Sequence, residues 1–376
     1  MVVVPFALNT LGLGFFSFAS IGLGRLGADS SSILKSIDYG GSWEEITVSG
    51  SKDQAPPQVV FTLEPHPQNS AIIYLGTAGS GLWRSDNGGK SWRKVFDKSG
   101  ILKPDADVYK IFVARGDPLV LYLSVFQDKR GRVLKSVDGG KNFHEIYFTP
   151  DGSEVSDLFV DHNNSDHVII ITGNGGLFET RDAGESWSLL HWLAVSPVGF
   201  AVNPYNTDEM YIAASSGKVF KTADSGKTLE ELKVGVESLP AQENHKAQED
   251  FYKQALDPSL LNDLGNIFGS GQNTIYINPL NYYDIIVGSR EGVFRSFDGG
   301  VSWQQVQAII PPGIKIDAVV VQSAKDSIMI IVGGEVYRTD DDGESWKISV
   351  IPGNPEVREL IIHPLKPEVI FAILGK

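Results

Sequence analysis

The amino-acid sequence predicts an all-β protein, a seven-bladed β-propeller in which every blade is a sheet of four strands. Three observations support this prediction. The 376 residues include 40 glycines, which is typical of a chain with many tight turns. One eight-residue motif recurs seven times along the chain. The two ends of the chain each carry half of a repeat, and the halves are complementary, as in a closed ring of blades.

The repeated motif reads Ser/Thr-x-Asp-x-Gly-x-Ser/Thr-Trp. Its third position holds Asp38, Asn87, Asp138, Asp182, Asp224, Asp298 and Asp341. Its last position holds Trp43, Trp92, Trp187, Trp303 and Trp346, with Phe143 and Leu229 in the third and fifth copies. Successive copies lie 42 to 51 residues apart, except for one interval of 74. Each copy therefore marks one four-stranded blade, and one blade is followed by a large insertion.

The chemistry of the motif predicts a tight turn between the third and fourth strands of a blade. The aspartate accepts backbone N–H groups of the turn, and the glycine two positions later adopts a positive φ. The hydroxyl closes the turn, and the aromatic residue anchors the next strand. The alternative is a catalytic or calcium-binding role. We interpret the aspartates as structural, because the motif recurs in every blade whereas an active site occurs once.

Each motif follows two short β-rich runs, for example residues 59–63 and 72–76, and a glycine loop. His66, His162 and His363 occupy the corresponding turn between the first two strands of their blades. We interpret them as turn residues. No spacing typical of metal ligands is present, so we predict neither a metal site nor a cofactor.

The two ends of the chain predict how the ring closes. Residues 33–46 supply only the third and fourth strands of a blade, and residues 357–374 supply only the first and second. Pairing of these strands completes a seventh blade and leaves no exposed end blade. Because the chain has no cysteine, strand pairing without a disulfide holds the ring together.

The first segment of the chain is apolar. Residues 2–24 carry no charge, and Arg25 is the first charged side chain. Three interpretations remain open: a cleaved signal peptide, an uncleaved membrane anchor, or a wrong start or truncated chain. The first two assign residues 1–28 to the signal or anchor and residues 29–376 to the propeller, and they predict export to the periplasm, the extracellular space or a lumen. Residues 22–27 match GxGxxG without the strand–helix context of a dinucleotide site.

The interval of 74 residues inserts residues 235–271 into the propeller. Apolar side chains there recur at i,i+4 spacing, Phe251 and Tyr252 among them, and Asp257-Pro258 separates two such stripes. This pattern predicts a helical hairpin. It is either a decoration packed on the propeller or a lid or partner-docking element.

The loops of a propeller lie on two faces. Turns that join the first to the second strand and the third to the fourth strand share one face, and the remaining loops share the other, where ligands usually bind. On this ligand face we expect Asp105, Asp107, Asp128, Lys129, Arg130, His191, Trp192, Phe251, Tyr252, Arg290 and Glu291. Asp105, Asp107 and Asp128 are the acids to test for catalysis.

The motif resembles the Asp-box (BNR) repeat of a β-propeller family, and its seven copies span nearly everything after residue 33. The resemblance implies either hydrolysis or binding. Sialidases of this family use an arginine triad and a tyrosine nucleophile, and xyloglucan hydrolases place an acid pair between two propellers, whereas this chain has few arginines and one propeller. The photosystem II assembly factor is a non-catalytic seven-bladed member, and sortilin-type receptors bind peptides inside a ten-bladed ring.

The net charge of -14 repels phosphate backbones, so we do not expect nucleic acid as a partner. The sequence predicts an exported, monomeric, non-catalytic propeller that binds a protein or glycan, with membrane tethering through residues 2–24 as one form of export. A sialidase- or xyloglucanase-like glycoside hydrolase is the alternative.

Overall fold

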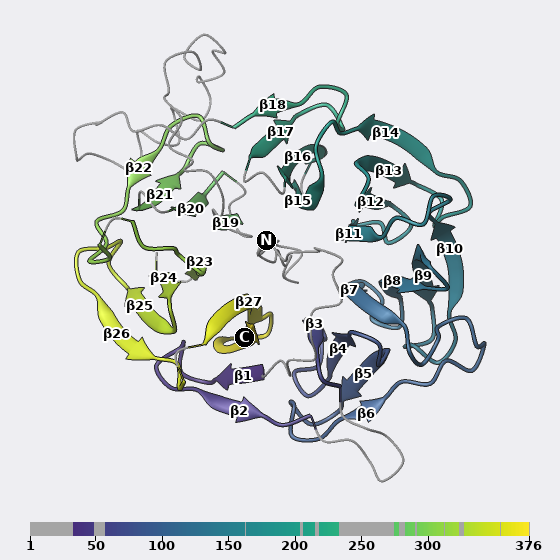
Figure 1. Ribbon diagram of the computed structural model, residues 1–376, viewed down its shortest axis with the longest axis horizontal. Coiled ribbons are helices and arrows are strands. Elements are labelled where there is room, and N and C mark those ends of the chain that lie inside the picture. Colours follow the sequence, from purple (N-terminus) through teal and green to yellow (C-terminus); the bar gives the residue numbers. More distant parts are fainter. Residues whose placement is uncertain are drawn as a thin grey trace.

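A computed structural model gives the structure of the chain. It describes residues 33–48, 57–161, 163–203, 206–214, 218–232, 274–277, 283–289, 292–311, 313–322, 327–353 and 355–375. Within these residues 28 strands form seven four-stranded antiparallel sheets arranged around a central axis (Figure 1). The predicted seven-bladed propeller is therefore confirmed. The described residues contain no helix, and hence none that could span a membrane.

Each blade runs from an innermost strand, here called strand A, to an outermost strand D. Blade 1 contains β3 (Val60–Pro65), β4 (Ile73–Thr77), β5 (Leu82–Ser85) and β6 (Arg93–Lys94). Blade 2 contains β7 (Asp107–Val113), β8 (Leu121–Gln127), β9 (Arg130–Ser136) and β10 (His144–Phe148). Blade 3 contains β11 (Val155–Val160), β12 (Val168–Thr172), β13 (Gly176–Thr180) and β14 (Ser188–Trp192). Blade 4 contains β15 (Pro197–Asn203), β16 (Asn206–Ala214), β17 (Val219–Thr222) and β18 (Glu230–Glu231).

The remaining blades follow the same order. Blade 5 contains β19 (Thr274–Ile277), β20 (Ile285–Ser289), β21 (Gly292–Ser296) and β22 (Gln304–Gln305). Blade 6 contains β23 (Ala318–Gln322), β24 (Ser327–Val332), β25 (Glu335–Thr339) and β26 (Lys347–Val350). Blade 7 contains β27 (Glu356–His363) and β28 (Lys366–Gly375), followed in the sheet by β1 (Ile33–Ser36) and β2 (Glu44–Ile46).

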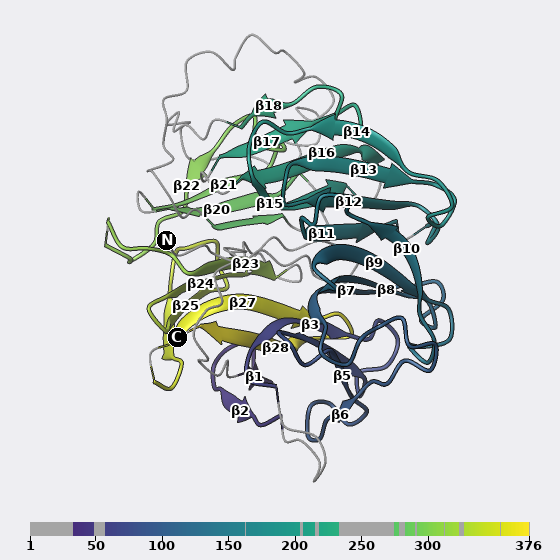
Figure 2. The same ribbon diagram turned by 45° about the vertical axis from the view of Figure 1, so that its right-hand side comes forward.

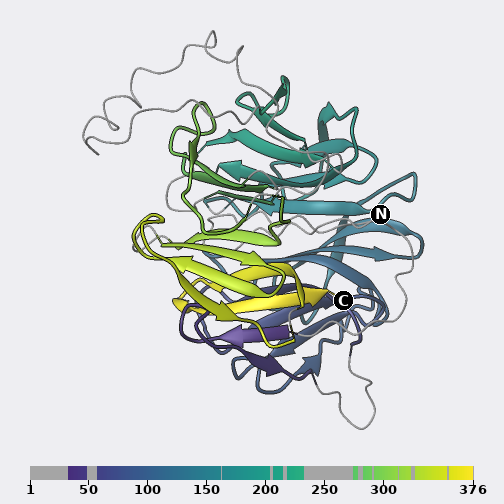
Figure 3. The same cartoon turned by 60° about the vertical axis from the view of Figure 1, so that its left-hand side comes forward.

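Blade 7 joins segments from opposite ends of the sequence. Strand β1 pairs with β28 in antiparallel register, with Ile33 opposite Ile373 and Ser36 opposite Ile370. Figures 2 and 3 show purple β1 and β2 beside yellow β28. The backbone N–H of Tyr39 also donates to the carbonyl of Glu368 across this sheet.

The inner strands of the blades are buried on both faces. Every residue of β12 and of β24 is buried, whereas the outer strand β10 has no fully buried residue. Each sheet packs against a neighbouring blade on either side, so its inner strands form continuous apolar runs rather than the alternating pattern of a half-exposed sheet. The core of the molecule consequently lies in layers between adjacent blades.

The repeated motif forms the turn between strands C and D in each blade. In blade 3 the Oδ1 atom of Asp182 accepts the backbone N–H of Ser186 (2.9 Å), and the hydroxyl of Thr180 accepts the N–H of Gly184 (2.9 Å). The glycine has a φ of +95°, in the left-handed region that the sequence pattern predicts. In the other six copies too, the backbone N–H of the corresponding glycine donates to the Ser or Thr hydroxyl. Both oxygens of the Asp182 carboxylate are thus engaged inside its own turn.

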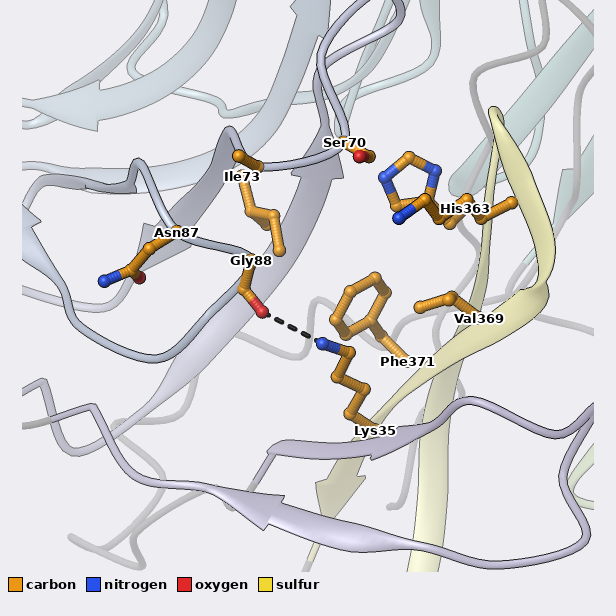
Figure 4. A pocket seen from close by; sticks show the side chains of 10 residues that line it. Lys35, Ser70, Ile73, Asn87, Gly88, His363, Val369 and Phe371 are labelled. Carbon is orange, nitrogen blue, oxygen red and sulfur yellow. Dashed lines mark hydrogen bonds between the residues drawn. The ribbon is translucent and has the colours of Figure 1, made fainter.

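The residue that precedes the motif donates a hydrogen bond to the next blade at four of the seven seams, and at a fifth the guanidinium of Arg338 lies over the ring of Tyr39. Lys35 donates to the carbonyl of Gly88 (Figure 4), Lys135 to Asp166, Lys221 to the carbonyl of Gly299, and Arg295 to Asp342. A basic residue at this position therefore ties one blade to the next, in addition to the apolar packing between sheets.

Hydrogen bonds between turns assign the loops to two faces. In blade 1 the N–H of Gly88, in the C–D turn, donates to the carbonyl of Ala71, in the A–B turn. On the other face the N–H of Gly81, in the B–C loop, donates to the carbonyl of Ala106, in the loop before blade 2. We call these the motif face and the loop face. The predicted segments 1–28 and 235–271 lie entirely outside the residues that the structure describes.

Candidate functional site

Two of the predicted acids lie where the chain enters blade 2, Asp105 in the loop and Asp107 at the start of β7. The Oδ1 atom of Asp107 accepts the backbone N–H of Gly79 in the B–C loop of blade 1 (2.7 Å). Burial raises the pKa of Asp107, the bond from Gly79 opposes that rise, and the charge of Asp105 adds to it. Asp107 is therefore a half-buried carboxyl that holds two blades together at the loop face.

Asp128 lies on the same blade. The B–C turn consists only of Asp128 and Lys129, with φ values of +51° and +63°, as in the tight turns that join two hairpin strands. The sequence analysis placed Arg130 in this loop, whereas the structure places it in β9. The Asp128 carboxylate lies 3.5 Å from the ammonium of Lys103 and 3.4 Å from the guanidinium of Arg132.

Gln127 links this turn to the loop that carries Asp105 and leads to Asp107. Its side-chain amide donates to the carbonyl of Ile101 (2.8 Å), and its Oε1 atom accepts the N–H of Lys103 (3.0 Å). The structure therefore brings Asp105, Asp107 and Asp128 into one sector of the loop face, built on blade 2. The side chain of Gln127 is buried. Its sequence position alone, a polar residue at the end of a strand, gives no sign of this burial.

Aromatic side chains extend this sector. The guanidinium of Arg130 lies over the ring of Phe148, 5.2 Å from its centroid, and Phe148 is 46% exposed. One blade further round the ring, the indole of Trp192 is 53% exposed at the end of β14, and its neighbour His191 is partly buried. Tryptophan and arginine are among the residue types that dominate the energetics of binding surfaces.

Two further aromatic residues were missed by the sequence analysis. Phe61 of β3 and Tyr109 of β7 come from the innermost strands of blades 1 and 2, and their ring centroids are 5.0 Å apart. Each residue lies at a shift of one residue in the pairing of its strand with the next strand. The alternation of side chains in a regular strand therefore does not predict to which side of the sheet these two rings point. Burial raises the pKa of Tyr109.

Other predicted residues are accounted for as follows. Phe251, Tyr252, Arg290, Glu291 and His162 lie outside the described residues. The Nδ1 atoms of His66 and His363 accept the N–H groups of Gln68 and Leu365, as expected of turn residues. Within the described part of the chain, no group of three His, Cys, Asp or Glu side chains could hold a metal ion.

Comparison with known proteins gives partial matches to two groups. No family model matches the chain. The xyloglucanase Xgh74A of Acetivibrio thermocellus is 27% identical over 197 residues, which cover 45% of this chain and 23% of that protein. A xyloglucanase of Paenibacillus sp. is 25% identical over 194 residues, which cover 19% of its length. The match thus spans less than a quarter of these curated relatives.

Solved structures give a broader match in shape. The GH74 xyloglucanase of Xanthomonas campestris has a TM-score of 0.57 at 14% identity, covering 89% of this chain and 52% of that one. YCF48 of Cyanidioschyzon merolae has a TM-score of 0.58 at 14% identity, covering 84% and 95%. YCF48 bound to a D1 peptide has a TM-score of 0.52 at 12% identity. The chain is accordingly a seven-bladed β-propeller similar to the GH74 xyloglucanases and to YCF48.

Proposed function

We propose that this protein is a non-catalytic propeller that binds a protein or glycan ligand through its loop face. One observation carries the proposal: two of the three acids that could serve catalysis there are already bound to the protein itself. Asp107 accepts a backbone N–H from the neighbouring blade, and Asp128 pairs with Lys103 and Arg132. Carboxylates in these roles fix the loops that present the surface.

The surface around these acids fits a binding role. Phe148 and Trp192 present aromatic rings to solvent, and the partly buried Arg130 places its guanidinium over the Phe148 ring. Such side chains supply most of the binding energy at the centre of protein interfaces, and flat aromatic faces also stack on apolar faces of ligands. The rigid blades beneath them hold the groups in place, which limits the entropy lost on binding.

The extent of the structural matches supports a protein partner. The structural match covers 95% of the YCF48 chain but 52% of the Xanthomonas campestris xyloglucanase chain. A single propeller of this kind therefore matches nearly the whole of YCF48 and about half of the xyloglucanase. The YCF48 structure with a D1 peptide contains a peptide ligand. We further propose export of the protein, on the strength of the uncharged segment 2–24.

Glycoside hydrolysis is the second candidate, and one observation favours it. Asp107 has a raised pKa, caused mainly by burial, and Asp105 lies just before it in the chain. A carboxyl with a raised pKa beside a second carboxyl is the arrangement that a glycosidase requires of its general acid and its partner. The 27% identity with xyloglucanase Xgh74A over 197 residues adds weight to this candidate.

A paired assay separates the two candidates. The full chain and the variants Asp105→Asn and Asp107→Asn are incubated with xyloglucan and other polysaccharides, with Asp117→Asn, on the motif face, as the control. Under the binding proposal, neither the full chain nor any variant releases more sugar product than a blank without protein. Turnover that both loop-face variants abolish and the control retains would establish the hydrolase instead.

Binding is measured on the same preparations, against xyloglucan oligosaccharides and a peptide array. The proposal expects saturable binding that Arg130→Ala and Trp192→Ala each weaken by about tenfold, since such residues contribute at least about 1.4 kcal/mol apiece at binding centres. Binding that both variants leave unchanged would contradict the assignment to this face.

A further inference from the structure

The outermost strand of blade 6 differs from those of the other six blades. Each outermost strand has one side with which no strand among the described residues pairs. Four of these strands, β2, β6, β18 and β22, are two or three residues long and consist mostly of charged or amide side chains. The longer strands β10 and β14 each carry a register shift. Short, charged or bulged edges resist the addition of a further strand.

Strand β26 is neither very short nor bulged. Its four residues pair with β25 in an unbroken register, and Figure 1 shows it on the outer rim of the ring. Ile348 and Val350 are each 56% exposed, and because they lie two positions apart they share one face of the strand. Lys347, the charged residue of the strand, pairs with Asp340. A regular edge with exposed β-branched side chains is a template for strand addition.

The unpaired backbone groups of this edge belong to two residues. The N–H of Ile351, which follows the strand, donates to the carbonyl of Gly334 (2.7 Å). Alternate residues of an antiparallel pair direct their backbone groups at the partner strand. Ser349 therefore faces β25, whereas the backbone groups of Ile348 and Val350 face outward. Within the part of the chain that the structure describes, these outward groups have no hydrogen-bond partner.

Contacts with both neighbouring blades hold this strand in place. The hydroxyl of Ser349 donates to the carbonyl of Gly40 in blade 7 (2.8 Å). Just before the strand, the indole N–H of Trp346 donates to the carbonyl of Gln307, which follows the outer strand of blade 5 (2.9 Å). The edge is thus a fixed template, so that a ligand strand loses its own conformational freedom but the protein loses little.

The hairpin that carries this edge is acidic. Residues 335–350 contain five Asp or Glu and two Lys or Arg, and both basic side chains pair with one of the acids, Asp340. Glu335 lies opposite the last residue of β26, and Glu344 lies shortly before its first. Both glutamates are exposed. A ligand strand with positive charge at each end would therefore be attracted at both ends of the edge.

The size and charge of the edge favour a peptide over a second copy of this chain. Stable interfaces between proteins bury about 1,200 Å² or more, and an edge of four residues with two exposed apolar side chains supplies only a small part of that area. The net charge of -14 on each copy also opposes the approach of a second one. A single extended segment needs no larger surface, because its backbone pairs directly with the edge.

We propose that the outer edge of β26 binds an extended basic segment of a partner protein as a fifth antiparallel strand of blade 6. The segment pairs with the outward backbone groups of Ile348 and Val350. Its apolar side chains, at alternate positions, pack on the exposed side chains of these two residues, and its basic ends face Glu335 and Glu344. The edge contains none of the residues assigned to the loop-face ligand surface, so either proposal can fail without the other.

The test uses the full chain and the peptide acetyl-RVSITVR-amide, followed by titration calorimetry at low ionic strength. Two further peptides are methylated on the backbone nitrogens of either the Val and Ile residues or the Ser and Thr residues. Residues directly opposite each other in antiparallel strands share a face, so the Val and Ile nitrogens face the edge. We expect saturable binding of the parent peptide and of the Ser/Thr-methylated peptide, and none of the Val/Ile-methylated peptide. Equal binding of the two methylated peptides, or no binding of the parent at millimolar concentration, would overturn the proposal.

A variant of the protein locates the site. Val350→Pro removes an outward N–H and breaks no bond to β25, a change that edge strands tolerate, and it should weaken binding of the parent peptide by about tenfold or more. Gln305→Pro is the matched control. Gln305 occupies the corresponding place in β22, immediately before Val306, whose N–H donates to the carbonyl of Val293 (2.9 Å), and this variant should bind the peptide normally.

Thermal unfolding shows whether blade 6 is intact in these variants, and the methylated peptides test the same contact on the unaltered protein. Binding that Val350→Pro leaves unchanged would place the peptide elsewhere and refute the proposal. Sedimentation velocity tests the other occupant: a dimer of the wild type that Val350→Pro dissociates would assign the edge to a second copy instead.

Discussion

The Nζ atom of Lys110 lies 3.4 Å from Oδ1 of Asp157, and the two side chains are 9% and 4% exposed. The pair joins the innermost strands of blades 2 and 3. Asp157 also accepts the backbone N–H of Phe200, on the innermost strand of blade 4 (3.4 Å). Each member of the pair directly follows a shift in strand register. One buried carboxylate thus connects three consecutive blades near the axis of the ring.

Removing the cation of this pair should destabilise the fold. Lys110→Met leaves the charge of Asp157 buried without its partner, so we expect the free energy of unfolding to fall by about 3–5 kcal/mol at pH 7. Urea unfolding followed by tryptophan fluorescence measures the change. The double variant Lys110→Met/Asp157→Leu is the control and should recover most of the loss. A loss below about 1 kcal/mol in the single variant would contradict a buried ion pair.

The same variant should respond to pH. Burial already raises the pKa of Asp157, and without Lys110 it rises further. A carboxyl whose pKa is higher in the folded state binds its proton more tightly there, so folding stability increases as pH falls through that pKa. Lys110→Met should therefore regain stability relative to the wild type between pH 7 and pH 5. Unfolding midpoints in urea across this range provide the measurement, and parallel pH profiles would refute the prediction.

A second buried cation ties blade 5 to blade 6. Arg295 donates to both oxygens of Asp284 (2.7 and 2.8 Å) and to Asp342 of the next blade (2.8 Å). Lysine cannot reproduce this two-pronged geometry, so Arg295→Lys should cost about 1–3 kcal/mol. Arg181→Lys, at an exposed arginine that pairs with the largely buried Glu179, should change stability by less than about 1 kcal/mol, because the lysine stays in solvent and can still approach the carboxylate. Equal effects of the two variants in chemical denaturation would argue against the seam role.

The turns of the repeated motif should contribute to acid unfolding. Hydrogen bonds from Ser186, with a further bond from Thr180, lower the pKa of Asp182 to about 2 from a usual value of 3.8. Because the folded pKa is depressed, this contribution is present above about pH 4 and is lost as pH falls toward 2. Asp182→Asn should flatten the unfolding-temperature profile in that window. Asn87 already occupies this position in blade 1, so Asn87→Asp should steepen the profile; no change in either variant would refute the assignment.

One glycine on the loop face permits two blades to meet. An added Cβ at Gly131 would lie 2.6 Å from the backbone nitrogen of Val155 and 2.7 Å from the carbonyl oxygen of Ser153. Gly131→Ala should therefore force the loop before blade 3 away and cost about 1–3 kcal/mol. Gly116→Ala is the control, because nothing lies within 4 Å of its added Cβ. Thermal unfolding of both variants tests the contact, and equal unfolding temperatures would contradict it.

Local sequence patterns predict those parts of the fold that depend on neighbouring residues. The hydroxyl, aspartate and glycine of each motif lie within a few residues of one another, so Thr180, Asp182 and Gly184 form the same turn wherever they recur. Counting the motifs yields the number of blades. The buried side chains of Lys110 and Asp157 lie 47 positions apart, in strands that the sequence places in separate blades, and no local pattern predicts that they pair.

The sequence by itself determined the all-β repeat, its seven blades and the turns that carry the motif, because short-range hydrogen bonding and turn geometry specify them. Only the tertiary structure decided how the blades are tied together and what each loop side chain does. It joined Asp107 to Gly79, directed Phe61 and Tyr109 toward each other, and assembled a cavity lined by Lys35 and His363 from both ends of the chain. These contacts depend on the packing of whole sheets and on shifts of register, which the order of residues in one blade does not encode.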